Sequence, residues 1–275
     1  MTQVPDIKLH GGSRLPKIGL GTSKLEDPRV RIREALEVGY RHIDTASRYD
    51  NETEVGLGIK DFAVDRSELF ITTKLRGYDQ GFDNAKRALD DSLQRLGLEY
   101  VDLFLIHWPL PRLDKYVESW RAMEEMLAVG KTKAVGVSNF LPTHLERLAA
   151  ETSLVPAVNQ IQLNPLFSQR DLVDYHADHG IVTEAWSPLG KGQLLGNPAL
   201  DEIAAKHGKS AAQVILRWHL DQDIVVIPKA SHRDRMQQNL DVFDFSLDSD
   251  DTAVINALNT GKGREGFDPA IHEEF

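Results

Sequence analysis

Short runs of apolar, mostly β-branched residues alternate along the chain with longer amphipathic segments. This alternation is typical of parallel β-strands that are joined by crossover helices. It predicts eight inner strands, at residues 17–20, 42–44, 69–73, 101–106, 134–137, 157–161, 182–185 and 224–227. The predicted helices include residues 28–38, 83–96, 117–129, 169–179, 210–221 and 249–258. Ahead of the first strand, Gly11 and Gly12 separate two short apolar runs and predict a β-hairpin.

Two fold classes fit this alternation, a closed (β/α)8 barrel and an open doubly wound sheet. Eight units in about 250 residues match the barrel. An open sheet that binds dinucleotides carries a glycine-rich turn after its first strand, and GLGTSK at residues 19–24 does not complete the G-x-G-x-x-G pattern. We therefore predict an α/β fold, a single-domain TIM barrel over residues 1–275, with an N-terminal hairpin and a C-terminal extra helix.

Composition narrows the class of function. The 275 residues include no cysteine, which excludes disulfides, thiolate metal sites and a cysteine nucleophile. The net charge of −10 disfavours general binding to nucleic acid or to anionic membranes. Neither a secretory signal nor an apolar stretch of membrane-spanning length is visible. We expect a cytoplasmic protein, and a monomer, because no long apolar stripe requires an obligate partner.

Four ionisable side chains of different types stand where a barrel places its chemistry, at the carboxyl ends of strands. Asp44, Lys74 and His107 follow the second, third and fourth predicted strands, and Tyr49 lies in the loop after Asp44. Alone, each has a structural interpretation as a turn cap, an ion-pair partner or a core histidine. Together they suit a carbonyl that gains charge on oxygen, because an ammonium lowers a phenol's pKa and a neutral imidazole can donate a hydrogen bond. With no activated nucleophile and no metal cluster visible, we expect the electrons to come from a cofactor.

Three longer runs resemble the signatures of the aldo-keto reductases. They are GYRHIDTASRYDNETEVG at residues 39–56, MLAVGKTKAVGVSNF at 126–140 and IPKASHRDRMQQNL at 227–240. The shorter runs ITTKL, LIHWP, NQIQLNP and EAWSPLGKGQLL also stand in the family's order. The short loop after His107 and the short tail resemble the prokaryotic branch, near the 2,5-diketogluconate reductases. The resemblance covers essentially the whole chain. It implies metal-free, NADPH-dependent reduction of small carbonyl compounds, including dicarbonyls and keto-sugar acids.

The same resemblance implies a role for each matching residue. Tyr49 would be the general acid, Lys74 and Asp44 would tune it, and His107 would orient the carbonyl. NADPH would lie extended across the barrel mouth, with Trp186 stacked on the nicotinamide ring. The implied cofactor-binding residues are Gly21, Thr22, Ser138, Asn139, Gln160, Trp186, Ser187, Leu189, Gly192, Lys229, Ala230, Arg235, Gln238 and Asn239.

Two of these cofactor residues bear on the choice between NADPH and NADH. Lys229 and Arg235 match the family positions that hold the 2′-phosphate, so the resemblance implies NADPH. Ala230 and Gln238 depart from the usual hydroxyl residue and glutamate, which weakens that expectation.

The expected substrate pocket departs further from the family. It comprises Ser23, Arg48, Arg76 and Trp108. Of these, only Trp108 is an aromatic residue of the kind that usually lines this pocket in the family. Our hypothesis is a roomier, more cationic pocket that favours carbonyl substrates bearing a carboxylate. The alternative is that both arginines point into solvent.

Two other functions remain open at this point. Lys74 could form a Schiff base in an aldolase barrel, although a nearby carboxylate should keep it charged. The chain could also be a non-catalytic NADPH-binding module on the same fold.

Overall fold

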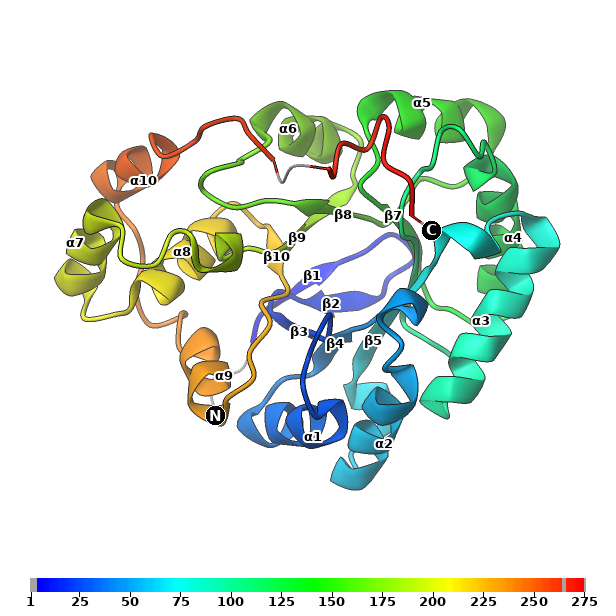
Figure 1. The fold of residues 1–275 in the computed structure, drawn as a ribbon, viewed down its shortest axis with the longest axis horizontal. Coiled ribbons are helices and arrows are strands. Elements are labelled where there is room, and N and C mark those ends of the chain that lie inside the picture. Colours follow the sequence, from blue (N-terminus) through cyan, green and yellow to red (C-terminus); the bar gives the residue numbers. More distant parts are fainter. Residues whose placement is uncertain (1–3, 264–265, 275) are drawn as a thin grey trace.

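The computed structural model describes residues 4–263 and 266–274, so residues 1–3, 264–265 and 275 of the predicted domain lie outside it (Figure 1). Eight parallel strands follow one another in chain order around a single sheet. They are β3 (Gly19–Gly21), β4 (His42–Asp44), β5 (Phe70–Leu75), β6 (Leu103–Ile106), β7 (Val135–Ser138), β8 (Val158–Gln162), β9 (Val182–Trp186) and β10 (Val225–Val226).

The last strand meets the first, which closes the sheet. Ile18 forms a parallel bridge with Val226, and the Val226 amide donates to the Lys17 carbonyl at 3.0 Å. The prediction of a (β/α)8 barrel is therefore confirmed. The strands are buried on both faces, as expected for parallel strands packed between a barrel interior and a ring of helices.

Helices surround the barrel (Figure 1). They are α1 (Pro28–Val38), α2 (Glu52–Phe62), α3 (Phe82–Leu96), α4 (Tyr116–Ala128), α5 (Pro142–Glu151), α6 (Arg170–Asp178), α7 (Pro198–His207), α8 (Ala211–Leu220), α9 (Arg233–Leu240) and α10 (Ser249–Asn256), with short 3-10 turns at η1 (Ser47–Tyr49), η2 (Arg66–Glu68), η3 (Gly77–Asp79) and η4 (Gly190–Gly192). Local chemistry fixes several of these starts. In α8 the Ser210 hydroxyl accepts from the Gln213 amide, while the Gln213 side chain accepts from the Ser210 amide.

The predicted hairpin closes one end of the barrel. It pairs β1 (Asp6–Lys8) with β2 (Arg14–Pro16) through a turn in which Gly11 and Gly12 have φ of +83° and +95°. Leu9 and Leu15 are buried in a cluster with residues from the amino-terminal parts of the strands. In residues 4–263 and 266–274, the amino-terminal end of the barrel is therefore closed, and ligands can enter at the carboxyl end.

The C-terminal segment crosses this open end. After α10 the chain, red in Figure 1, passes α6 and returns over the mouth of the barrel to the side of α4 and β7. The sequence pattern predicted the helix but not the course of residues 266–274. In the described part of the chain, no helix is both long and apolar enough to cross a membrane.

Candidate active site

The structure brings the four predicted catalytic side chains together at the mouth. Asp44 ends β4, Lys74 lies next to the end of β5, and His107 directly follows β6. The Lys74 ammonium donates to Asp44 Oδ1 at 2.6 Å, to the Thr45 carbonyl at 2.9 Å and to the Tyr49 hydroxyl at 3.3 Å. The rings of Tyr49 and His107 meet edge to face, with centroids 5.8 Å apart. A phenol and an imidazole thus face the same space above a buried ion pair.

Burial and charge act against each other on these groups. Burial acts to lower the pKa of Lys74, but the charge of Asp44 and the hydrogen bond to its carboxylate act in the opposite direction, and the net pKa of Lys74 is raised, so the amine stays protonated. For Tyr49, burial raises the pKa and the Lys74 charge acts in the opposite direction. The expected lowering by Lys74 is present, but the net pKa of Tyr49 is raised. At neutral pH the phenol therefore keeps its proton.

A second layer of polar groups lies beneath the ion pair, inside the barrel. The Gln160 amide donates to Asp44 Oδ2 at 2.8 Å and to Glu184 Oε2 at 2.7 Å. Burial raises the pKa of Glu184 to about 8, and the charge of Asp44 adds to the effect. Glu184 is therefore mostly protonated at neutral pH, so that Asp44 alone carries the charge beside Lys74. Sequence reasoning missed Glu184, although a glutamate inside the strand VTEAW was a usable signal.

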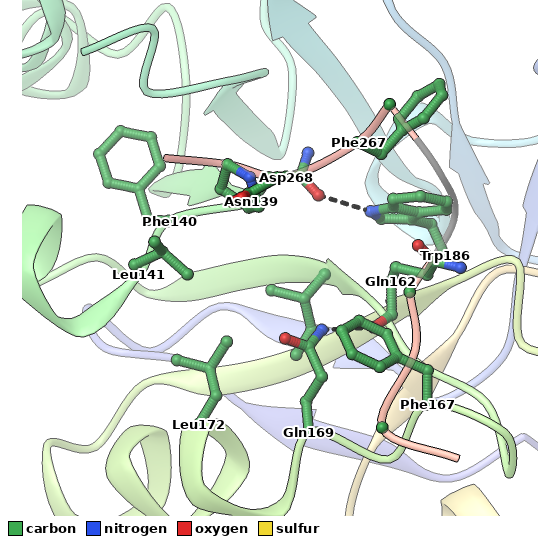
Figure 2. Close-up of a pocket in the computed structure, with 15 residues that line it drawn as sticks. Asn139, Phe140, Leu141, Gln162, Phe167, Gln169, Leu172, Trp186, Phe267 and Asp268 are labelled. Atoms are coloured by element: carbon green, nitrogen blue, oxygen red, sulfur yellow. Dashed lines mark hydrogen bonds between the residues drawn. The ribbon is translucent and has the colours of Figure 1, made fainter. Parts of the chain in front are cut away.

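Side chains at the ends of β7 and β9 hold one another in place. Asn139 has a left-handed backbone with φ of +61°, and its amide donates to the His107 carbonyl at 3.1 Å. Its Oδ1 accepts from the Trp186 indole at 2.8 Å (Figure 2). The Ser138 hydroxyl donates to the Gln160 carbonyl at 2.7 Å. These contacts fix a half-buried indole and an amide beside His107, where the resemblance placed the nicotinamide.

Three observations test whether the mouth fits a dinucleotide. Thr22 Oγ1 is buried and has no hydrogen-bond partner in the described ranges, so the end of β3 carries a polar group whose hydrogen bonds are unused. In the loop after β9, Ser187, Gly190 and Gly192 all have positive φ, which turns the backbone sharply beside Leu189. Gly21 cannot carry a side chain, because its Cβ would lie 2.8 Å from the Ile227 carbonyl oxygen. These features fit the proposed cofactor residues.

The residues expected near the 2′-phosphate divide into two groups. Lys229, Arg235 and Gln238 are exposed, and the Lys229 ammonium donates to the Lys24 carbonyl at 3.3 Å. Ala230 and Asn239 are buried. Two cations are therefore available to an anionic group at the start of α9, whereas the buried pair supports the fold around them.

The four expected substrate residues do not form one wall. Trp108 is buried under the C-terminal segment, with its ring centroid 3.9 Å from that of His272 and 5.8 Å from that of Phe267. Ser23 and Arg48 are exposed at the surface. Arg76 lines a different cavity, of about 260 Å³, together with Ser47, Asp50, Glu52, Thr53, Asp79 and Arg95.

A residue that sequence reasoning missed lies against His107. Glu274 Oε1 is 2.7 Å from His107 Nδ1, and Glu274 Oε2 accepts from the Gly77 amide at 2.9 Å. No periodic pattern in the sequence predicts the position of Glu274, because that position depends on how the C-terminal segment returns over the barrel.

A cavity of about 440 Å³ lies beside Trp186 and Asn139, under the C-terminal segment (Figure 2). Apolar side chains from the starts of α5 and α6 form much of its wall. The lining residues are Asn139, Phe140, Leu141, Ile161, Gln162, Phe167, Gln169, Leu172, Trp186, Gly261, Gly263, Gly266, Phe267, Asp268 and Pro269.

Comparison with known proteins places this geometry in context. A sequence profile described as the Aldo/keto reductase family matches residues 17–260. The glyoxal reductase of Bacillus subtilis is 48% identical over 256 residues, which cover 92% of each protein. The methylglyoxal reductase DkgA of Escherichia coli is 46% identical over 267 residues, 96% of each protein. The crystal structure of a Gox0644 mutant in complex with NADPH shares 43% identity and a TM-score of 0.94, covering 99% of this chain and 100% of that one.

Proposed function

The chain belongs to the aldo/keto reductase family, and we propose that it reduces small aldehydes and ketones to alcohols with NADPH. The observation that carries the proposal is the buried Lys74, which contacts both Asp44 and the Tyr49 hydroxyl beside His107. The similarity to glyoxal and methylglyoxal reductases points to small dicarbonyl compounds as the first substrates to test.

Tyr49 acts as the general acid in this proposal. Its raised pKa keeps the phenol protonated, so it has a proton to give to a carbonyl oxygen that becomes negative. The Lys74 ammonium then stabilises the phenolate that remains, and Asp44 holds Lys74 in position. His107 orients the carbonyl oxygen against the phenol.

The family resemblance implies the cofactor residues, and their positions at the mouth support the proposal. Ser138, Asn139 and Gln160 would hold the carboxamide of the nicotinamide, and Trp186 would pack on its ring. Because the Gln160 amide nitrogen already serves Asp44 and Glu184, its amide oxygen is the group that it offers to the cofactor. The exposed cations Lys229 and Arg235 would bind the 2′-phosphate. When bound, NADPH supplies the hydride that reduces the carbonyl carbon.

Neither of the two other functions explains the site as well. A Schiff-base aldolase needs an unprotonated lysine, whereas Lys74 has a raised pKa and donates to Asp44 and to a backbone carbonyl. A protein that only binds NADPH does not require the contacts of the Lys74 ammonium with the Tyr49 phenol and the Asp44 carboxylate.

A spectrophotometric assay tests the proposal. We expect glyoxal and methylglyoxal to oxidise NADPH, seen as loss of absorbance at 340 nm, and NADH to serve less well. A protein that binds NADPH but reduces none of a broad set of aldehydes and ketones contradicts the catalytic proposal. Trapping of a substrate on Lys74 by borohydride would favour the aldolase instead.

We further propose a single-domain, cytoplasmic monomer. The chain has no cysteine, so its fold needs no disulfides and is compatible with a reducing compartment. Light scattering of the purified protein tests the monomer, with the mass of 30.8 kDa expected.

A further inference from the structure

Glu274 brings a carboxylate into the catalytic site from the end of the chain. Its side chain is 8% exposed. One oxygen accepts from the Gly77 amide at 2.9 Å, and the other lies 2.7 Å from His107 Nδ1, outside the direction of a hydrogen bond. A buried carboxylate with two such contacts is held in one place.

This carboxylate is charged. Burial acts to raise the pKa of Glu274, but His107, the Gly77 amide and the charge of Arg48 outweigh it and lower that pKa. The negative charge of Glu274 also acts on Tyr49, the general acid, because it is one of the causes that raise the pKa of Tyr49. The catalytic site therefore contains an internal anion next to two of its reacting groups.

The segment that carries Glu274 is docked at several points. His272 and Phe267 pack on Trp108, and the Glu273 carboxylate pairs with Arg112 at 3.0 Å. The Glu274 backbone runs so close to Gly77 that a Cβ there would lie 2.4 Å from the Glu274 carbonyl oxygen. The contact between Glu274 and His107 is therefore made by a segment that packs against the barrel at several points.

We propose that Glu274 is a specificity-determining residue that makes this site favour uncharged carbonyl compounds over those that carry a carboxylate next to the carbonyl. An incoming carboxylate must either lie beside Glu274 or displace it from the Gly77 amide and His107, and both are unfavourable. The inference rests on the proposed reductase function. It reverses the sequence hypothesis that Arg48 and Arg76 favour acids, because Glu274 offsets the charge of Arg48 and Arg76 faces a different cavity.

Glyoxal and glyoxylate form a matched pair for the test, since both offer an aldehyde and differ in whether a formyl group or a carboxylate stands next to it. The measured quantity is the ratio of kcat/KM for glyoxylate to kcat/KM for glyoxal with NADPH. In Glu274→Gln the amide can still accept from Gly77, but the charge is gone. We expect the ratio to rise by about tenfold, the size of effect that removal of one close like charge produces.

Glu273→Gln is the matched control, because it removes the same charge one residue away, where the carboxylate pairs with the largely exposed Arg112. Its ratio should stay within about twofold of the wild-type ratio. Gly77→Ala adds a second arm, since the new Cβ forces the Glu274 backbone away while the carboxylate is kept. We expect it to raise the ratio as well.

The outcomes separate the two proposals. If the wild-type protein reduces glyoxal but Glu274→Gln leaves the ratio unchanged or lowers it, the role of Glu274 is wrong and the reductase function stands. An equal rise in Glu273→Gln and Glu274→Gln also overturns it, because the overall charge of the tail would then matter rather than the position of Glu274. If neither aldehyde is reduced by any variant, the proposed function itself fails for these substrates.

Discussion

The Lys74 ammonium lies 2.6 Å from the Asp44 carboxylate, and the two side chains are 0% and 2% exposed. Taking two charges out of water costs free energy that their attraction roughly repays. Removing one partner leaves the other charge buried and unpaired, which is far more costly than losing an exposed pair. The ion pair therefore links the catalytic site to the stability of the barrel.

Lys74→Met should destabilise the protein by about 3–5 kcal/mol, because it leaves Asp44 charged and buried. Urea unfolding followed by circular dichroism measures the free energy of unfolding. Lys86→Met is the control, since Lys86 pairs with Glu125 at the surface, where a pair is worth at most about 1 kcal/mol. Equal losses in the two variants would show that the Asp44–Lys74 pair is not a special contributor.

Tyr49→Phe should lower kcat by a factor of about 10² to 10⁴, because it removes the proton donor and little else. The dissociation constant of NADPH, measured by fluorescence titration, should stay close to the wild-type value. Tyr78→Phe provides a control at an exposed tyrosine, 60% accessible, and should leave kcat unchanged. Turnover by Tyr49→Phe at the wild-type rate would show that Tyr49 is not the general acid.

Glu184→Gln should become more stable relative to the wild-type protein as pH rises from 5 to 8. In the native state the pKa of Glu184 is about 8, against an ordinary value of 4.5. Between these values the unfolded chain has released the proton and the folded protein still holds it, so wild-type stability falls with rising pH by at most about 1.4 kcal/mol per unit from this group. Glutamine does not titrate, so this contribution disappears.

The measurement is the difference between the free energies of unfolding of Glu184→Gln and the wild-type protein at pH 5, 6, 7 and 8. Other titrating groups largely cancel in that difference. A difference that is flat across the range would mean that Glu184 is ionised in the folded protein.

His176 should make the protein less stable in acid. Its Nε2 accepts from the Asn159 amide at 2.9 Å while its Nδ1 donates to the Thr183 hydroxyl, also at 2.9 Å, an arrangement that requires the neutral ring. Burial lowers the pKa of His176 to about 4, below the ordinary 6.5. The contribution to stability is therefore complete above pH 6.5 and is lost as pH falls from there toward 4.

In His176→Gln the free energy of unfolding should be lower than wild type at pH 7.5 but should fall less between pH 6.5 and 4. The control is His10→Gln, at an exposed histidine in the turn of the N-terminal hairpin, which should leave the wild-type slope intact. A wild-type slope in His176→Gln would mean that other groups carry the acid sensitivity.

The sequence predicted most of the barrel because each strand and helix carries its own local pattern. The strand that ends at Asp44 was predicted at its observed bounds, and the β5 strand that carries Lys74 was predicted within two residues. Once a closed barrel is assumed, side chains at the carboxyl ends of its strands must share one mouth, so the catalytic group follows from chain order.

Two features could not be predicted in this way. Glu274 reaches His107 because a segment without helical or strand periodicity returns over the mouth, and its path depends on contacts with distant residues, such as the packing of His272 and Phe267 on Trp108. Arg76 follows Lys74 by only two residues, yet it faces a different cavity, because the chain turns into a 3-10 helix directly after it. Both outcomes depend on side-chain packing between distant segments.

The hairpin under the barrel has a consequence for the order of events in a catalytic cycle. Because Leu9 and Leu15 close the base in the described part of the chain, ligands reach and leave Tyr49 and Lys74 through the carboxyl end of the barrel. Two ligands that share a single entrance bind in a fixed order. The ligand that lies deeper in the barrel binds first and leaves last.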